Sequence, residues 1–187
     1  MATKLIIPEK YLEEIKAEGM RESGKRRNFP RPGKEARGRL FGYYDEQRNL
    51  ILVNEKYTVC SLIGDGTEKS NNKDLFTDLL NSPKIIYVCL KELLYIERMK
   101  QKGTIPAIIY YHSHPQGNIL RNGNSYLIQK FPWSKKDICV AREFQKHYKK
   151  SEVMYAMLLY KVFENEFEAL YGETKLEVQS LGRETSR

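Results

Sequence analysis

Cysteine is scarce in this chain, and its pattern excludes two classes of protein. Cys60, Cys89 and Cys139 stand far apart in apolar surroundings among 187 residues. An odd number of cysteines at wide spacing does not form the disulfide framework of a small secreted domain, and a cysteine-rich structural zinc site is excluded as well. We therefore expect reduced thiols in the protein core and a cytoplasmic protein.

Long apolar runs are also missing. No segment approaches the roughly eighteen consecutive apolar residues of a membrane-spanning helix. The apolar stretch from Met1 to Ile7 is too short for a signal peptide. The sequence thus predicts a soluble protein without a membrane partner.

Acidic residues are outnumbered by basic ones, 24 against 32, which gives a net charge of +8. Such a surface favours acidic partners, or it is only a solvated exterior. Specific nucleic-acid binding is not expected, because no recognised nucleic-acid module is visible. With 41% apolar residues the chain has enough core for one domain, which we expect over residues 1–180, followed by a disordered tail at 181–187.

The chain has only three histidines, and two of them follow the apolar run at 105–111. Such a run is typical of a strand that is buried on both faces. Side chains two positions apart share one face of a strand, so His112 and His114 can bind one ion while Ser113 points away. Pro115 cannot donate to a strand ladder, and it is expected to end the strand at the histidines.

A carboxylate ligand is expected from Asp137, in the first turn of a helix that runs to about Tyr148 and has Ser134 as its N-cap. Two imidazoles and one carboxylate leave the fourth tetrahedral position of Zn²⁺ open for water. This is the arrangement of a catalytic zinc site, not of a structural one.

Each part of this pattern also has a purely structural explanation. A His-x-His pair on a strand is more often incidental than a metal site. The stretch from Ser134 to Asp137 is explained as a capping motif, with Trp133 and Ile138 as its hydrophobic staple. The conjunction of the two motifs favours a metal site.

A candidate base lies upstream, in a Glu-x-x-Gly-x-Leu-x-Gly segment at 35–42 that opens the first clear strand. Hydrolysis at a zinc ion needs a base for its water. Together, Glu35, the His-Ser-His-Pro sequence at 112–115 and the Ser-x-x-Asp sequence at 134–137 resemble the JAMM motif of the JAB1/MPN/Mov34 metalloprotease family. The resemblance covers roughly residues 5–180 in element order.

This resemblance implies a zinc-dependent isopeptidase or peptidase, similar to deubiquitinases, that acts after the C-terminal tail of a ubiquitin-like or sulfur-carrier-like protein. It implies His112, His114 and Asp137 as zinc ligands. Glu35 would be the general acid–base, and Ser134 would donate to the oxyanion, cap the helix, or do both. The implied fold is α/β: a mixed, largely antiparallel curved sheet flanked by helices, cytidine-deaminase-like, as in MPN/JAB domains.

Two departures from the family pattern stand out. The 18 residues at 116–133 precede Ser134 where the family usually has a few, and Arg37 and Arg39 stand where apolar residues are usual. The first departure implies an inserted element at the mouth of the site. Its Asn122-Gly123 pair, between strand-compatible residues, predicts a β-hairpin that is either a lid or docking edge, or an ordinary surface insertion.

Periodicity and turn residues predict the other elements. We expect a helix at 8–18 stopped by Gly19, a hairpin of strands at 35–44 and 49–58, a short helix at 74–80 in a polar insertion at 61–83, a strand at 84–90, a helix at 91–102, and a meander of strands at 153–162, 167–171 and 175–179. The basic residues between 21 and 34 form either a solvated loop or a positive rim that attracts an acidic protein or a C-terminal carboxylate.

Three other interpretations stay open. A catalytically silent MPN scaffold would keep the fold without activity, although silent relatives usually lack the ligands that this chain has. A non-haem iron oxygenase also uses two histidines and one carboxylate, and metal analysis would distinguish it. A basic nucleic-acid binder would show an affinity that falls steeply with salt.

Overall fold

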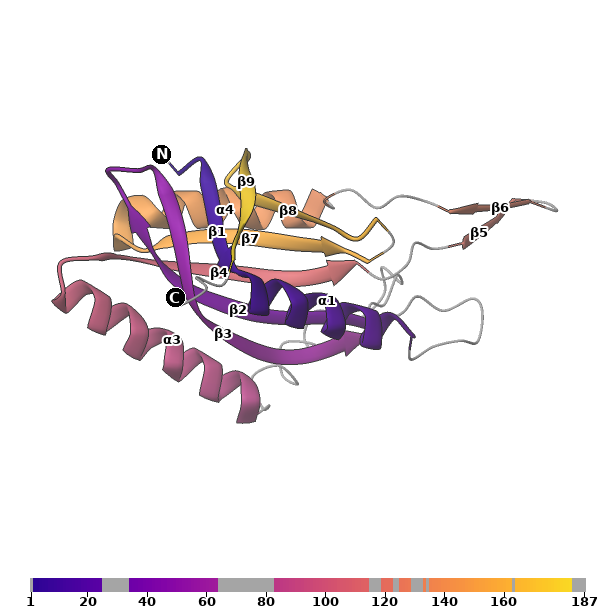
Figure 1. Ribbon diagram of the computed structural model, residues 1–187, viewed down its shortest axis with the longest axis horizontal. Coiled ribbons are helices and arrows are strands. Elements are labelled where there is room, and N and C mark those ends of the chain that lie inside the picture. Colours follow the sequence, from indigo (N-terminus) through magenta and orange to yellow (C-terminus); the bar gives the residue numbers. More distant parts are fainter. Residues whose placement is uncertain are drawn as a thin grey trace.

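The computed structural model describes residues 2–24, 34–63, 83–114, 119–122, 125–128, 133, 135–162 and 164–182. These residues form a mixed α/β fold with three helices, a sheet of seven strands and a separate two-stranded hairpin (Figure 1). The helices are α1 (Glu9–Gly24), α3 (Pro83–Gln101) and α4 (Lys135–Ser151). The strands are β1 (Lys4–Pro8), β2 (Lys34–Asp45), β3 (Leu50–Ile63), β4 (Ile105–His114), β5 (Ile119–Asn122), β6 (Ser125–Ile128), β7 (Met154–Lys161), β8 (Glu166–Tyr171) and β9 (Thr174–Leu181).

The large sheet has the order β1-β3-β2-β4-β7-β8-β9 and closes into a barrel. Closure depends on β1, which pairs in parallel with β3 on one side and with β9 on the other. The mixed α/β class expected from the sequence is confirmed. The sequence predicted a curved sheet, whereas the structure has a closed one. The prediction missed the closure because β1, the strand that joins β3 to β9, was not recognised as a strand.

Strand β4 lies between β2, to which it is antiparallel, and β7, to which it is parallel. On one face its Ile109 and Tyr111 belong to the largest apolar cluster, together with Leu12 and Ile15 of α1. Its Ile108 faces outward, into a second cluster with residues of α3. Both faces of the strand are therefore covered, as expected from its apolar run, and β4 ends at His114.

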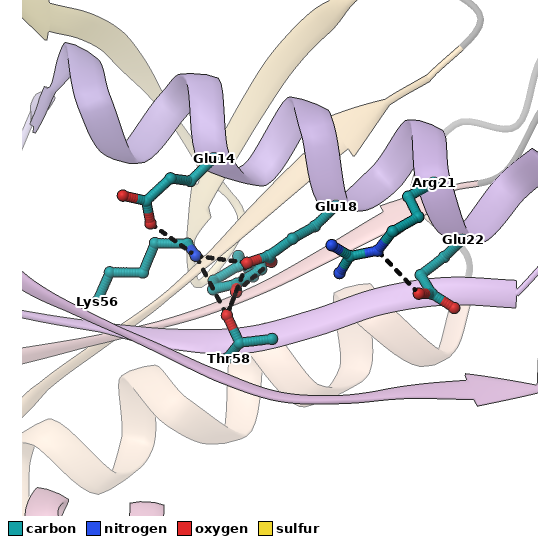
Figure 2. Close-up of polar contacts among 7 residues, drawn as sticks. Glu14, Glu18, Arg21, Glu22, Lys56 and Thr58 are labelled. Carbon is teal, nitrogen blue, oxygen red and sulfur yellow. Dashed lines mark hydrogen bonds and ion pairs between the residues drawn. The ribbon is translucent and has the colours of Figure 1, made fainter.

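Helix α1 is tied to the barrel by a polar cluster (Figure 2). The Lys56 side chain of β3 is 5% exposed and forms an ion pair of 2.6 Å with Glu18. Glu18 also accepts hydrogen bonds from the hydroxyls of Thr58, at 2.7 Å, and Tyr111, at 2.8 Å. Because Tyr111 belongs to β4, this cluster fixes α1 to the strand that carries the histidines.

The predicted end of the first helix at Gly19 is wrong. The helix begins at Glu9 and continues through Gly19 to Gly24. A Cβ atom on Gly19 would lie 2.8 Å from Cδ1 of Tyr160 and 3.2 Å from Cβ of Ser113. Glycine at this position lets α1 lie close against β4 and β7, so its role is packing and not termination.

The strand predicted at 84–90 is also wrong, because these residues form the first half of α3. The inner face of this helix is formed by residues that recur every three or four positions, as a helix requires. They are Val88, Glu92, Tyr95 and Met99. The predicted helix at 91–102 forms the second half.

The other predicted elements agree with the structure where it describes them. The strands at 35–44 and 49–58, the meander β7-β8-β9 and the inserted hairpin are confirmed. In the hairpin Asn122 pairs with Ser125, so the connecting residues are 123 and 124, one position later than the pair that predicted the turn. Figure 1 shows β5 and β6 standing away from the barrel. The role of this hairpin as a lid or docking edge stays a prediction.

Several expectations fall on residues outside the described ranges: the helix at 74–80, most of the basic stretch at 21–34, Ser134 and residues 183–187 of the tail. The tail was expected to begin at residue 181, but Leu181 is the last residue of β9, where it pairs with Pro8. Cys89 and Cys139 are free thiols, as expected, but Cys139 is exposed on α4 and is not a core residue. None of the helices among the described residues is long and apolar enough to cross a membrane.

Candidate metal centre

The end of β4 brings two imidazoles together. His112 and His114 lie on the same face of the strand, and their Nε2 atoms are 3.3 Å apart. Ser113 points to the opposite face, where it is fully buried. The two-residue period of the strand therefore gives the convergence that the sequence predicted.

The carboxylate comes from the first turn of α4. Oδ1 of Asp137 lies 3.7 Å from Nε2 of His112, and Oδ2 lies 3.9 Å from Nε2 of His114. Helix α4 is held in place by an apolar cluster in which Trp133 and Ile138 both pack, as expected for a hydrophobic staple. Position 134, where the N-cap was expected, directly precedes the helix and lies outside the described residues.

The spacing of these three groups suits a metal ion. One donor atom from each of His112, His114 and Asp137 lies within 4.8 Å of the other two. In a tetrahedral site with ligands at about 2.0–2.1 Å from zinc, neighbouring donors lie about 3.3 Å apart, which is close to the observed separations. The described residues thus contain a His-His-Asp group positioned to hold a metal ion, and its donor set fits zinc.

The ring of His112 is prepared for ligation by its surroundings. Burial lowers its pKa to about 4, while the charges of Asp137 and Glu35 act in the opposite direction. The imidazole is therefore neutral at physiological pH, which is the form that binds a metal. Trp133 lies edge-on to this ring, with ring centroids 5.9 Å apart, and forms part of its apolar surroundings.

Glu35 reaches the site from the start of β2. It shares a sheet face with Arg37, which is the register partner of His112 across the β2–β4 pair. Arg37 donates from Nε at 3.1 Å and from Nη2 at 2.6 Å, and both bonds go to Oε2 of Glu35. The charge of Glu35 acts to raise the pKa of His112, against the larger lowering effect of burial.

Two contacts that position Glu35 were not foreseen from the sequence. One is the Arg37 pair just described, since the sequence placed both side chains on one face without predicting their contact. The other is a hydrogen bond of 2.9 Å from the backbone N–H of Ala36 to Oγ of Ser113. It ties the residue next to Glu35 to the residue between the histidines. A signal for it exists in the sequence, because a serine that faces a strand's buried side needs a polar partner.

Arg39, the second unexpected arginine of β2, serves a different purpose. Its guanidinium forms an ion pair with Glu92 of α3 and stacks over the ring of Tyr110, 4.8 Å from the ring centroid. Arg39 and Glu92 are both largely buried. They fasten α3 to the sheet, so Arg39 belongs to the covering of β2 and not to the metal centre.

Neither the known protein families nor the curated proteins contain a match to this chain. The argument for the chemistry therefore rests on the site itself.

Proposed function

We propose that this protein is a zinc-dependent isopeptidase or peptidase. It hydrolyses an amide bond after the C-terminal tail of a ubiquitin-like or sulfur-carrier-like protein. The observation that carries the proposal is the convergence of His112, His114 and Asp137 from β4 and α4, with Glu35 on the same face of the neighbouring strand. Metal-assisted amide hydrolysis uses this combination of an electrophilic metal and a nearby acid–base group.

Zinc, when bound, supplies a Lewis acid for the carbonyl and lowers the pKa of a coordinated water from about 15.7 to about 7. The residues of the chain do the rest. Glu35 accepts at its carboxylate the proton of the water that attacks the carbonyl, and it then donates this proton to the leaving nitrogen as the C–N bond breaks, because an amine leaves poorly unless it is protonated. Arg37 holds Oε2 of Glu35 and leaves Oε1 for proton transfer. The proposal assigns Ser134, which lies outside the described residues, as a hydrogen-bond donor to the developing oxyanion.

The substrate class rests on the resemblance to the JAMM motif, and so does the assignment of the closed sheet and its helices to the cytidine-deaminase-like MPN/JAB architecture. The free thiols of Cys89 and Cys139 suit a reducing compartment, and we place the reaction in the cytoplasm.

Metal content tests the first part of the proposal. The full chain is expected to purify with, or take up, one zinc ion, measured by mass spectrometry of the metal. His112→Ala, His114→Ala and Asp137→Ala should each lower the occupancy. Full zinc occupancy in any of these variants would refute the site. Iron in place of zinc, with oxygen-dependent turnover, would favour the oxygenase interpretation.

Turnover of a panel of modifier domains, each joined through its C-terminal tail to a reporter by an amide bond, tests the second part. Glu35→Gln should keep its zinc and lose turnover by roughly 10²–10⁴-fold. Glu55→Gln is the matched control, because Glu55 is also a strand glutamate held by an arginine, Arg98, at 2.6 Å. Loss of zinc from the Glu35 variant would make Glu35 a ligand and overturn its role.

A further inference from the structure

The outer face of α3 carries an apolar stripe. Its members are large apolar side chains with 49–67% of their surface exposed: Ile86, Tyr87, Leu90, Leu93 and Leu94. The other exposed large apolar residues of the described chain, Met20, Val140 and Leu181, lie singly on different elements. Scattered residues need no explanation, whereas a contiguous apolar patch marks an interaction surface.

The described elements leave most of the α3 stripe uncovered; within it Tyr87 lies edge-on to the Tyr57 ring of β3, with ring centroids 6.5 Å apart. The helix packs its inner face on the sheet, where Val88, Tyr95 and Met99 join the cluster around Phe41 and Ile108. Figure 1 shows α3 at the lower edge of the molecule, with the sheet on its inner side. The stripe thus faces outward, on the side of the helix away from the barrel.

The stripe is symmetric about Leu90. Ile86 and Leu94 each lie four positions from Leu90, and Tyr87 and Leu93 each lie three positions from it. A second α3 placed antiparallel across a two-fold axis at Leu90 would therefore set Ile86 against Leu94 and Tyr87 against Leu93. A two-fold interface must be self-complementary in this way, because both copies contribute the same surface.

In the antiparallel pair, the beginning of each α3 lies beside the end of the other. The antiparallel helix dipoles also oppose each other favourably.

We propose that the chain forms a two-fold homodimer in which the α3 stripes of two copies pack together around Leu90. The five side chains expose several hundred Å² of mostly apolar surface, which with its polar rim approaches the roughly 800 Å² per partner of a stable interface. This inference does not depend on the proposed hydrolase activity. The rival occupant of the stripe is the chain's own segment at 64–82, outside the described residues, which would cover the stripe within one molecule.

The first measurement is the mass of the full chain in solution, by sedimentation equilibrium over a range of micromolar concentrations. A mass of twice 22.0 kDa is expected at the upper end. A chain that stays monomeric throughout overturns the proposal, and slow hydrogen exchange along α3 in that monomer would assign the stripe to the 64–82 segment instead.

The second measurement places the axis. Leu90→Glu puts two like charges against each other at the two-fold and should weaken the dimer at least about a hundredfold. Leu181→Glu is the matched control, because Leu181 is equally exposed, at 53% against 55%, but lies on β9. Its dimer should be unchanged. Circular dichroism verifies that both variants fold, as expected for substitutions at exposed positions.

The third measurement uses opposite charges. Leu90→Lys should also be monomeric, but a mixture of the Leu90→Glu and Leu90→Lys chains should form a heterodimer, because opposite charges then meet on the axis. Recovery of the dimer in the mixture is not expected if the stripe is covered within one chain or binds an unrelated protein. A wild-type dimer that survives Leu90→Glu, or a mixture that stays monomeric, overturns the proposed interface.

Discussion

His112 is a buried imidazole, and its burial makes the metal-free protein sensitive to acid. Its pKa is lowered to about 4 in the folded chain, against an ordinary value of 6.5. Between these two values the unfolded state binds more protons than the folded state. The free energy of unfolding therefore rises with pH across this window and falls as the solution is acidified.

We expect this histidine to contribute on the order of 3 kcal/mol to that dependence, at 1.36 kcal/mol per pKa unit. Urea denaturation of the metal-free protein between pH 4 and 6.5 measures it. Because carboxylates also titrate in acid, the relevant quantity is the difference between the wild-type chain and His112→Gln. In the variant the free energy of unfolding should depend less steeply on pH. An identical pH dependence in both chains would mean that His112 titrates normally.

Arg37 is the residue that we expect to control the position of Glu35. Arg37→Met removes both hydrogen bonds to Oε2 while keeping the length of the side chain. Under the proposed function, zinc content should not change, while turnover of the modifier panel should fall roughly ten- to a hundredfold, because the carboxylate is misplaced. Arg98→Met, which breaks the matched pair with Glu55, should leave turnover unchanged.

A double-mutant cycle separates positioning from general damage. In the Glu35→Gln chain, which lacks the carboxylate, Arg37→Met should cause little further loss. An equal loss in both backgrounds would show that Arg37 acts independently of Glu35.

The sequence could place both residues on one face, since that needs only the two-residue period of a strand. Their contact could not be predicted, because it depends on the side-chain conformations of Arg37 and Glu35. These conformations are constrained by the pairing of β2 with β4.

At the scale of the elements, the sequence was most misleading where both faces of an element are apolar. Residues 84–90 lack the polar positions that reveal a helical period, so the run resembles a buried strand. The structure explains the pattern: Val88 faces the sheet while Ile86, Tyr87 and Leu90 form the outer stripe. The failed prediction and the inferred dimer contact therefore have the same cause.

One other element was missed and another was predicted too short, because both depend on partners far away in the sequence. Strand β1 is only five residues long and is stabilised by pairing with β3 and β9. Helix α1 continues past Gly19 because this glycine meets Tyr160 and Ser113, which no local signal reveals. By contrast β4, α4 and the meander carry strong local patterns, and they were predicted correctly.

Gly38 gives a prediction about the contact between β2 and β4. A Cβ atom at this position would overlap the ring of Tyr111, whose hydroxyl is held by Glu18 of α1. The ring cannot move away without breaking the polar cluster, so Gly38→Ala should lower the free energy of unfolding by about 1–3 kcal/mol, as other overpacked core substitutions do. Gly182→Ala, which nothing within 4 Å obstructs, is the control.

Chemical denaturation measures both variants. The cost of Gly38→Ala should largely disappear in a Tyr111→Leu chain, because the shorter side chain leaves room for the methyl group. If the cost persists there, the strain comes from the backbone of β2, which has a register irregularity at this residue, and not from the Tyr111 ring.

At the scale of the whole molecule, the metal centre joins parts of the fold that are otherwise held by different clusters. His112 and His114 belong to β4, whereas Asp137 belongs to α4, which packs on β7 and β8 through its own apolar cluster. The unfolded chain does not hold these three groups together. A metal bound by all three therefore stabilises the folded state as a whole.

We accordingly expect zinc to raise the melting temperature of the metal-free protein. A ligand at a hundredfold excess over its Kd adds about 2.7 kcal/mol to the free energy of unfolding. For a chain of this size each kcal/mol shifts the melting temperature by about 2–4 °C, so the rise should be roughly 5–10 °C. Asp137→Ala should abolish the rise, while Glu35→Gln should retain it, because Glu35 is not a ligand. Differential scanning calorimetry measures all three chains. An equal rise in the Asp137→Ala chain would mean that zinc binds elsewhere, and a lost rise in the Glu35→Gln chain would place Glu35 among the ligands.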